Sequence, residues 1–166
     1  AVGASIATNS WGIPVNPSTG RTYAEGTYSE DSLNSDWYMW QNKEFQVLFS
    51  AGNDRTEASN VTITPPATAK NVIAVGAHCA GTSGWDDITS YSSWGPTYGP
   101  GFNPTDGRLK PDIAATGDGT TSYAGQYSAG NDNNRDGNRD TNYVTMQGTS
   151  MSSPTAAGGL ALIAQY

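Results

Sequence analysis

Three short apolar runs constrain the fold of this chain more than any other feature. They lie at Val2–Thr8, Phe45–Ala51 and Asn71–Ala77. Runs of this length, rich in β-branched and aromatic residues, are typical of strands that are buried on both faces. Strands of that kind occur in parallel sheets with helices packed on both sides. We therefore expect an α/β fold with a parallel sheet as its middle layer.

A helix is predicted between the first two runs, over Glu30–Glu44. Leu33, Trp37 and Trp40 recur there at helical spacing, with Met39 as a further apolar residue, and the segment begins with two acidic residues. Acidic side chains are favoured at a helix N-terminus because they complement its dipole. We expect this helix to cover one face of the sheet.

A second helix is predicted over Ser150–Gln165, which is rich in Ala, Gly and Leu and has Pro154 in its first turn, where proline is tolerated. We expect this helix to be buried. Before it, Asn142–Gln147 could form a short strand, whereas Tyr91–Gly119 is predicted to be loop and turn.

Composition excludes several classes of function. The 166 residues carry a net charge of −7, which argues against nucleic-acid binding, because phosphate contacts need clustered Lys and Arg. No apolar run is long enough to span a membrane. Cys79 is the only cysteine, so the chain has no internal disulfide. An acidic composition that is rich in Gly and Asn and poor in Lys is common among secreted proteins.

The segment QGTSMSSP, Gln147–Pro154, places three serine hydroxyls at the start of the second helix. Backbone N–H groups at such a position favour developing negative charge. Taken alone, Ser150 is better explained by helix capping than by catalysis, although capping accounts for only one of the three hydroxyls.

Several segments, read together and in order, are more specific than any one of them. TNSWG, FSAGND, PATAKNVIAVGA, YSSWGP, DGRLKPDIAATG and GTSMSSP resemble the subtilisin-like serine proteases, the subtilases. Within that family, the residues of these segments are most similar to those of bacterial extracellular alkaline proteases. The resemblance covers essentially the whole chain. It implies a secreted endopeptidase with a three-layer, parallel-sheet subtilisin-like fold, of which residues 1–166 would be the C-terminal portion of the catalytic domain.

The resemblance also implies roles for individual residues. Ser150 matches the family's nucleophile, and Asn53 matches the side-chain donor of the oxyanion hole, with the Ser150 N–H as the second donor. A fixed amide dipole is suited to stabilising charge that appears only in the transition state. Without the resemblance, a turn residue is the simpler interpretation of Asn53.

Two further segments match walls of the substrate cleft. One is a strand edge that pairs with an extended substrate, and the other lines the pocket for the residue before the scissile bond. The matching residues are Ser10, Trp11 and Gly12 for the edge, and Ser50, Ala51 and Gly52 for the pocket. For Trp11, ordinary packing is an equally good interpretation.

A serine nucleophile needs a base and a group that orients the base. In the family these are a His in H-G-[TS] and an Asp in D-[ST]-G, both upstream of NSWG, and neither segment occurs here. His78, the only histidine, does not match the catalytic position. We therefore expect the upstream half of the same catalytic domain as a partner, besides protein or peptide substrates. The chemistry itself requires no cofactor.

The pentapeptide SAGND occurs a second time, at Ser128–Asp132, and opens a polar stretch. Asp132, Asn134 and Asp136 stand at alternate positions before a glycine, as in the first half of a calcium loop. Tyr143 stands where a bidentate Glu is expected, and two arginines dilute the negative charge. A solvated surface loop is therefore the favoured interpretation, with a structural calcium site as the alternative.

Two rival functions stay open. A subtilase-fold module without activity, serving binding or scaffolding, would carry the same segments. An esterase of the α/β-hydrolase type fits poorly, because GTSMS is not the G-x-S-x-G sequence of that class.

Overall fold

The fold is built on a four-stranded parallel sheet. A computed structural model describes residues 3–13, 25–55, 59–80, 87–98, 107–119, 125–129 and 143–166. The strand order is β1 (Ile6–Asn9), β2 (Gln46–Ser50), β3 (Ile73–Cys79) and β6 (Ile113–Asp118), and all three pairings are parallel. The parallel sheet expected from the three apolar runs is confirmed.

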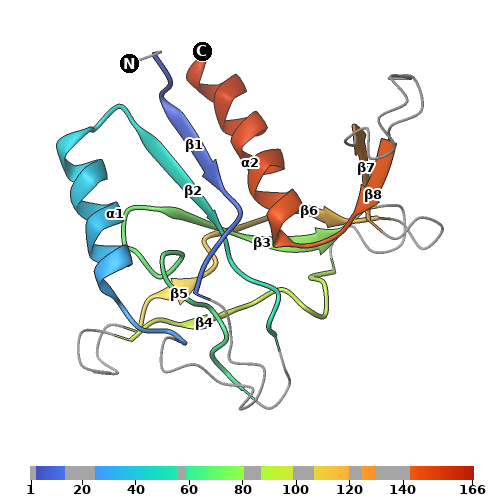
Figure 1. The fold of residues 1–166 in the computed structure, drawn as a ribbon, viewed down its shortest axis with the longest axis horizontal. Coiled ribbons are helices and arrows are strands. Elements are labelled where there is room, and N and C mark those ends of the chain that lie inside the picture. The colour runs from blue at the N-terminus through green and yellow to red at the C-terminus, as the bar shows by residue number, and fades with distance from the viewer. Residues whose placement is uncertain are drawn as a thin grey trace, which may run out of the picture.

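Two helices complete the layers. Helix α1 (Glu30–Gln41) connects β1 to β2, as a parallel pair requires, and α2 (Thr149–Ala164) follows the last strand. Figure 1 shows the two helices on opposite sides of the sheet. The three-layer α/β architecture is thus confirmed. No helix in the described ranges has both the length and the apolar character needed to cross a membrane.

Two small antiparallel pairs lie outside the main sheet. Strand β4 (Gly95–Pro96) pairs with β5 (Leu109–Lys110), and β7 (Gln126–Ala129) pairs with β8 (Tyr143–Met146). The short strand expected within Asn142–Gln147 is therefore present.

The fourth strand of the main sheet corrects the expectation that Tyr91–Gly119 is only loop and turn. Strand β6 lies within that segment and pairs with β3 from Val75↔Ile113 onward. Its sequence, IAATGD, is short and alanine-rich, so it has little intrinsic strand preference. Pairing with β3, rather than its own residues, makes it a strand.

Polar contacts decide which face of α1 is buried. The Ser32 and Thr68 hydroxyls are hydrogen-bonded at 2.8 Å, and the Asp36 carboxylate accepts from the backbone N–H groups of Lys70 at 2.9 Å and Asn71 at 2.6 Å. The residues of the apolar helical pattern lie on the other face: Leu33, Trp37 and Trp40 are all more than half exposed, and only Met39 joins the core. The pattern therefore predicts the helix correctly but not the face that packs.

The expectation that the second helix is buried is wrong for most of its length. Thr149, Ser152 and Ser153 in its first turn and a half are buried, whereas Leu162 and Ile163 are about 70% exposed (69% and 72%). The helix contacts all four strands of the sheet, but no described element covers its outer side.

Replacing Asp36 tests whether its carboxylate anchors α1. In D36A two backbone N–H groups lose their acceptor in a buried place, so we expect the free energy of unfolding of the full-length protein to fall by about 2–3 kcal/mol. The matched control is D31A, at an exposed position of the same helix, which should change it by no more than about 0.5 kcal/mol. Thermal unfolding followed by circular dichroism measures both. Equal losses in the two variants would contradict the anchoring role.

Candidate active site

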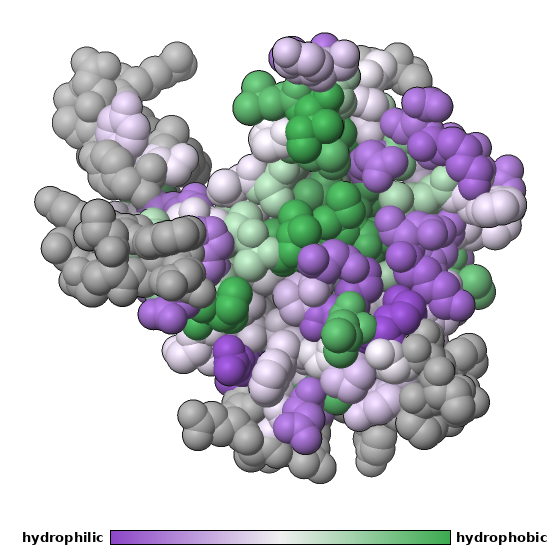
Figure 2. All heavy atoms as spheres, turned by 180° about the vertical axis from the view of Figure 1, so that it is seen from behind, coloured by the Kyte–Doolittle hydropathy of each residue, from purple (hydrophilic) through white to green (hydrophobic). Residues whose placement is uncertain are grey.

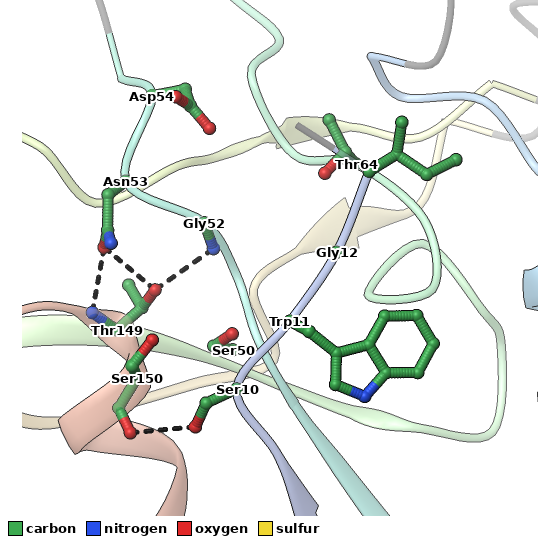
Figure 3. A pocket seen from close by; sticks show the side chains of 11 residues that line it. Ser10, Trp11, Gly12, Ser50, Gly52, Asn53, Asp54, Thr64, Thr149 and Ser150 are labelled. Atoms are coloured by element: carbon green, nitrogen blue, oxygen red, sulfur yellow. Dashed lines mark hydrogen bonds between the residues drawn. The ribbon is translucent and has the colours of Figure 1, made fainter. Parts of the chain in front are cut away.

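The candidate site lies at the edge of the sheet where β1 and β2 end and α2 begins. Parallel strands bring their carboxyl ends to the same edge, which is where open α/β sheets bind ligands. A pocket of about 220 Å³ opens there (Figure 3). It is lined by Ser10, Trp11, Gly12, Ile13, Ser50, Gly52, Asn53, Asp54, Thr64, Thr149 and Ser150.

Asn53 and Thr149 join two elements that are almost a hundred residues apart. The Asn53 Oδ1 accepts a hydrogen bond from the Thr149 N–H at 2.9 Å and another from the Thr149 hydroxyl at 3.0 Å. The Gly52 N–H in turn donates to the Thr149 hydroxyl oxygen at 3.2 Å. Because a backbone N–H can bond only to the amide oxygen, these contacts fix which end of the Asn53 amide is nitrogen.

Two hydrogen-bond donors are left without an acceptor at this place. Within the described residues no acceptor contacts the Asn53 Nδ2, and none contacts the N–H of Ser150, which is too near the helix start for an intrahelical bond. Figure 3 shows Asn53, Thr149 and Ser150 side by side on one wall of the pocket. The structure thus brings Asn53 and Ser150 into the lining of the same pocket.

The start of α2 is held by contacts from three directions. The Ser10 hydroxyl donates to the Ser150 carbonyl at 2.9 Å, and the hydroxyls of Thr8 and Ser153 lie 2.8 Å apart. The Gly148 N–H donates to the Gly117 carbonyl at 2.8 Å. These bonds fix the position of Ser150 relative to β1 and β6.

Five of the six residues predicted for substrate binding line the pocket. Ser10, Trp11 and Gly12 continue from β1, and the Trp11 ring is 56% exposed while its edge packs on Phe49 at 5.2 Å between ring centroids. Trp11 therefore packs on the core with one part of its surface and lines the pocket with another. Ser50 and Gly52 line the other side, whereas Ala51 points away into the hydrophobic core.

The loop after β2 is held in place by the segment around Ser93. Its hydroxyl accepts from the Asp54 N–H at 3.0 Å, its N–H donates to the Gly52 carbonyl at 3.0 Å, and the Arg55 N–H donates to the Tyr91 carbonyl at 3.1 Å. Gly52 has a φ of 105°, and a Cβ there would lie 2.9 Å from the Ser93 hydroxyl. Only glycine fits this position.

Asp54 is a charged pocket residue that the sequence motifs did not predict. Its side chain lines the pocket and is exposed to solvent on that side. The protein atoms on its other side remove part of its hydration, which raises the pKa of its carboxyl above the ordinary value. The available signal was its place directly after Asn53 in SAGND.

Other predicted residues lie apart from the pocket. The His78 Nδ1 is 2.7 Å from the Cys79 carbonyl and its Nε2 is 3.5 Å from the Thr116 hydroxyl. Asp118 and Asp87 add to the effect of burial in raising the pKa of the Cys79 thiol. Asp132, Asn134 and Asp136 fall outside the described residues, and the described ranges contain no group of three His, Cys, Asp or Glu that could hold a metal.

Comparison with known proteins identifies the class. The chain matches the subtilase family over residues 1–166, and it belongs to that family. It is 35% identical over 122 residues to the serine protease AprX of Bacillus subtilis, covering 72% of this chain and 26% of AprX. It is 25% identical to the serine protease/ABC transporter B family protein tagB of Dictyostelium discoideum, covering 99% of this chain and 12% of tagB.

Solved structures support the same fold. Sphericase superimposes with a TM-score of 0.58 at 22% identity, and S41 psychrophilic protease with 0.59 at 24% identity. Each match covers 95% of this chain and 42% of the other. The chain thus spans less than half the length of each of these relatives.

Gly148 allows a test of the geometry around Asn53. Its φ is 139°, and a Cβ there would approach the Asn53 Nδ2 to 3.2 Å. We expect G148A to lower the free energy of unfolding of the full-length protein by about 1–3 kcal/mol, because alanine is strained at this φ.

The control is G158A, in α2, where a Cβ meets nothing within 4 Å. It should leave stability unchanged or raise it by up to about 1 kcal/mol, since alanine favours helix. Chemical denaturation measures both variants. Equal stability of G148A and the unmodified protein would contradict the strained geometry at Gly148.

Proposed function

We propose that this chain supplies the nucleophile and the oxyanion hole of a serine endopeptidase. The observation that carries the proposal is the pair of unpaired donors, Asn53 Nδ2 and Ser150 N–H, beside the Ser150 hydroxyl in one pocket of the described part of the chain. Membership of the subtilase family supports the same activity, as does the similarity to a serine protease.

The proposed chemistry is acyl transfer. The Ser150 hydroxyl attacks the carbonyl carbon of a peptide bond, a base removes its proton, and the carbonyl oxygen becomes an oxyanion held by the two donors. The proton passes to the leaving amine, and water then hydrolyses the acyl-enzyme on Ser150. Because Thr149 occupies the Asn53 Oδ1, the amide keeps its donor end toward the developing charge.

The base is proposed to come from an upstream half of the same catalytic domain. His78, the only histidine of the chain, does not line the pocket. The outer edge of β1 has no partner strand among the described residues, and unpaired edges of this kind favour addition of another strand.

Exposed apolar surface supports such a partner. An open hollow of about 330 Å³ lies between α1 and the strands β1 and β2, with Tyr38, Phe45 and Phe49 in its lining. Figure 2 shows apolar residues gathered over the centre and top of the face opposite to that of Figure 1. Large exposed apolar areas are typical of interaction surfaces. The substrates would be proteins or peptides, and the acidic composition favours an extracellular location.

Labelling with a fluorophosphonate, which reacts only with activated serines, tests the proposal. We expect the full-length protein to be labelled stoichiometrically on Ser150 and S150A to remain unlabelled. The chain of residues 1–166 alone should remain unlabelled, because an unassisted serine hydroxyl is a weak nucleophile. No labelling of the full-length protein would favour an inactive module for binding or scaffolding. Labelling of the chain alone would show that it contains its own base.

The hydroxyl of Thr149 is proposed to position Asn53. T149V keeps the shape of the side chain but removes one donor to the Asn53 Oδ1, so we expect kcat of the full-length protein to fall about tenfold with KM little changed. T149S retains a hydroxyl and should restore most of kcat. Equal kcat for T149V and T149S would contradict the positioning role.

A further inference from the structure

Tyr91 lies outside the candidate pocket but connects two segments that hold its walls. It is not one of the described residues that line the pocket. Its backbone carbonyl accepts from the N–H of Arg55 at 3.1 Å, in the loop that carries Asn53. Its hydroxyl donates to the carbonyl of Gly117 at 3.1 Å, near the end of β6. The backbone and the side chain of this one residue thus link the loop after β2 to β6.

Gly117 is the point of β6 that contacts the start of α2. Its carbonyl accepts from the Gly148 N–H at 2.8 Å, and Gly148 immediately precedes Thr149, the first residue of the helix. A Cβ on Gly117 would lie 2.7 Å from the Gly148 carbonyl oxygen and would collide with the Ser152 hydroxyl, so the two segments are in close contact. The Gly117 carbonyl therefore accepts from two donors, and the Tyr91 hydroxyl limits how far it can move.

The backbone at Gly148 depends on contacts of this kind. Its φ is 139° and it has no side chain, so only bonds of its backbone can fix it. Two residues further along the chain, the Ser150 N–H is one of the two donors of the proposed oxyanion hole. Such a donor is effective only about 3 Å from the oxyanion. A small shift at Gly148 would therefore change the geometry of the hole.

The Tyr91 hydroxyl is suited to a lasting bond. The side chain is partly buried, and burial raises the pKa of its hydroxyl above the ordinary value. The hydroxyl therefore stays protonated, and able to donate, into the alkaline range. The segment that carries it is itself fixed, because the buried Ser92 and Ser93 hydroxyls accept from the N–H groups of Ala77 and Asp54, each at 3.0 Å.

We infer that Tyr91 is a positioning residue of the oxyanion hole. Through its carbonyl it holds the loop of Asn53, and through its hydroxyl and Gly117 it holds the segment that presents the Ser150 N–H. Both donors are thereby kept at the spacing that a single oxyanion requires. The inference rests on the proposed function and deepens it, because it names a residue outside the pocket that keeps the two donors aligned.

Replacing Tyr91 with phenylalanine tests this role, because Y91F removes only the hydroxyl. In the full-length protein we expect kcat to fall about fivefold with KM little changed, since the bond that is lost acts on the transition state. Fluorophosphonate labelling of Ser150 counts the active molecules, so a misfolded fraction does not enter kcat. Y98F serves as the control: it removes the same atom from a partly buried tyrosine that packs on the hydrophobic core, and it should leave kcat unchanged.

Repeating Y91F in an N53A background separates positioning from a general structural loss. Without Asn53 the Ser150 N–H has no second donor to be aligned with, so we expect the fivefold loss to shrink below about twofold. An equal loss in the two backgrounds would overturn the inference, as would an unchanged kcat in Y91F or an equal fall in Y98F. Each of these results, with the unmodified protein labelled and cleaving peptides, would leave the proposed function standing. An unmodified protein that is neither labelled nor active would overturn the proposed function and this inference with it.

Discussion

The hydrogen bonds between Asn53 and Thr149 are the constraint on which the candidate site depends. They tie the loop after β2 to the first turn of α2, and both elements are also held by the sheet. This pair of hydrogen bonds therefore fixes the orientation of the Asn53 amide, the start of α2 and the position of Ser150. A site built in this way is preorganised, because its donors need not turn when charge develops.

Helix α1 packs on the rest of the protein largely through polar side chains, and both helices expose large apolar ones. The inner face of α1 is anchored through Ser32 and the Asp36 carboxylate, while its tryptophans face outward. The outer side of α2 also exposes large apolar residues, Leu162 and Ile163 among them. Both features have one physical explanation if further chain packs beside β1, because apolar side chains gain free energy only where they leave water.

Within the described ranges, the buried ammonium group of Lys110 has a counter-ion, unlike the carboxylate of Asp54 in the pocket. The Lys110 ammonium is enclosed but satisfied by the Asp112 carboxylate at 2.6 Å and the Val72 carbonyl at 2.9 Å, although burial still lowers its pKa. Asp54 has no such partner among the described residues. In a structural ion pair the two side chains neutralise each other, whereas an unpaired carboxylate in an open pocket is available to a ligand.

Local sequence pattern was enough to predict most elements and the family. Period and composition indicated the three apolar strands, both helices and the parallel arrangement, because strands buried on both faces cannot alternate in polarity. The segments around Asn53 and Ser150 indicated the family and, through the family, a candidate role for each of these two residues. The order of polar and apolar residues predicts strands and helices because each side chain of an element must suit the core or the solvent that it faces.

Contacts between distant segments determine the features that pattern did not predict. Strand β6 exists because β3 pairs with it, and α1 buries the face that carries Asp36 because the backbone at Lys70 and Asn71 needs an acceptor there. Asp54 became a pocket residue only through the turn at Gly52 and the bond to Ser93. These outcomes depend on partners far away in the sequence, and neither propensity nor periodicity contains them.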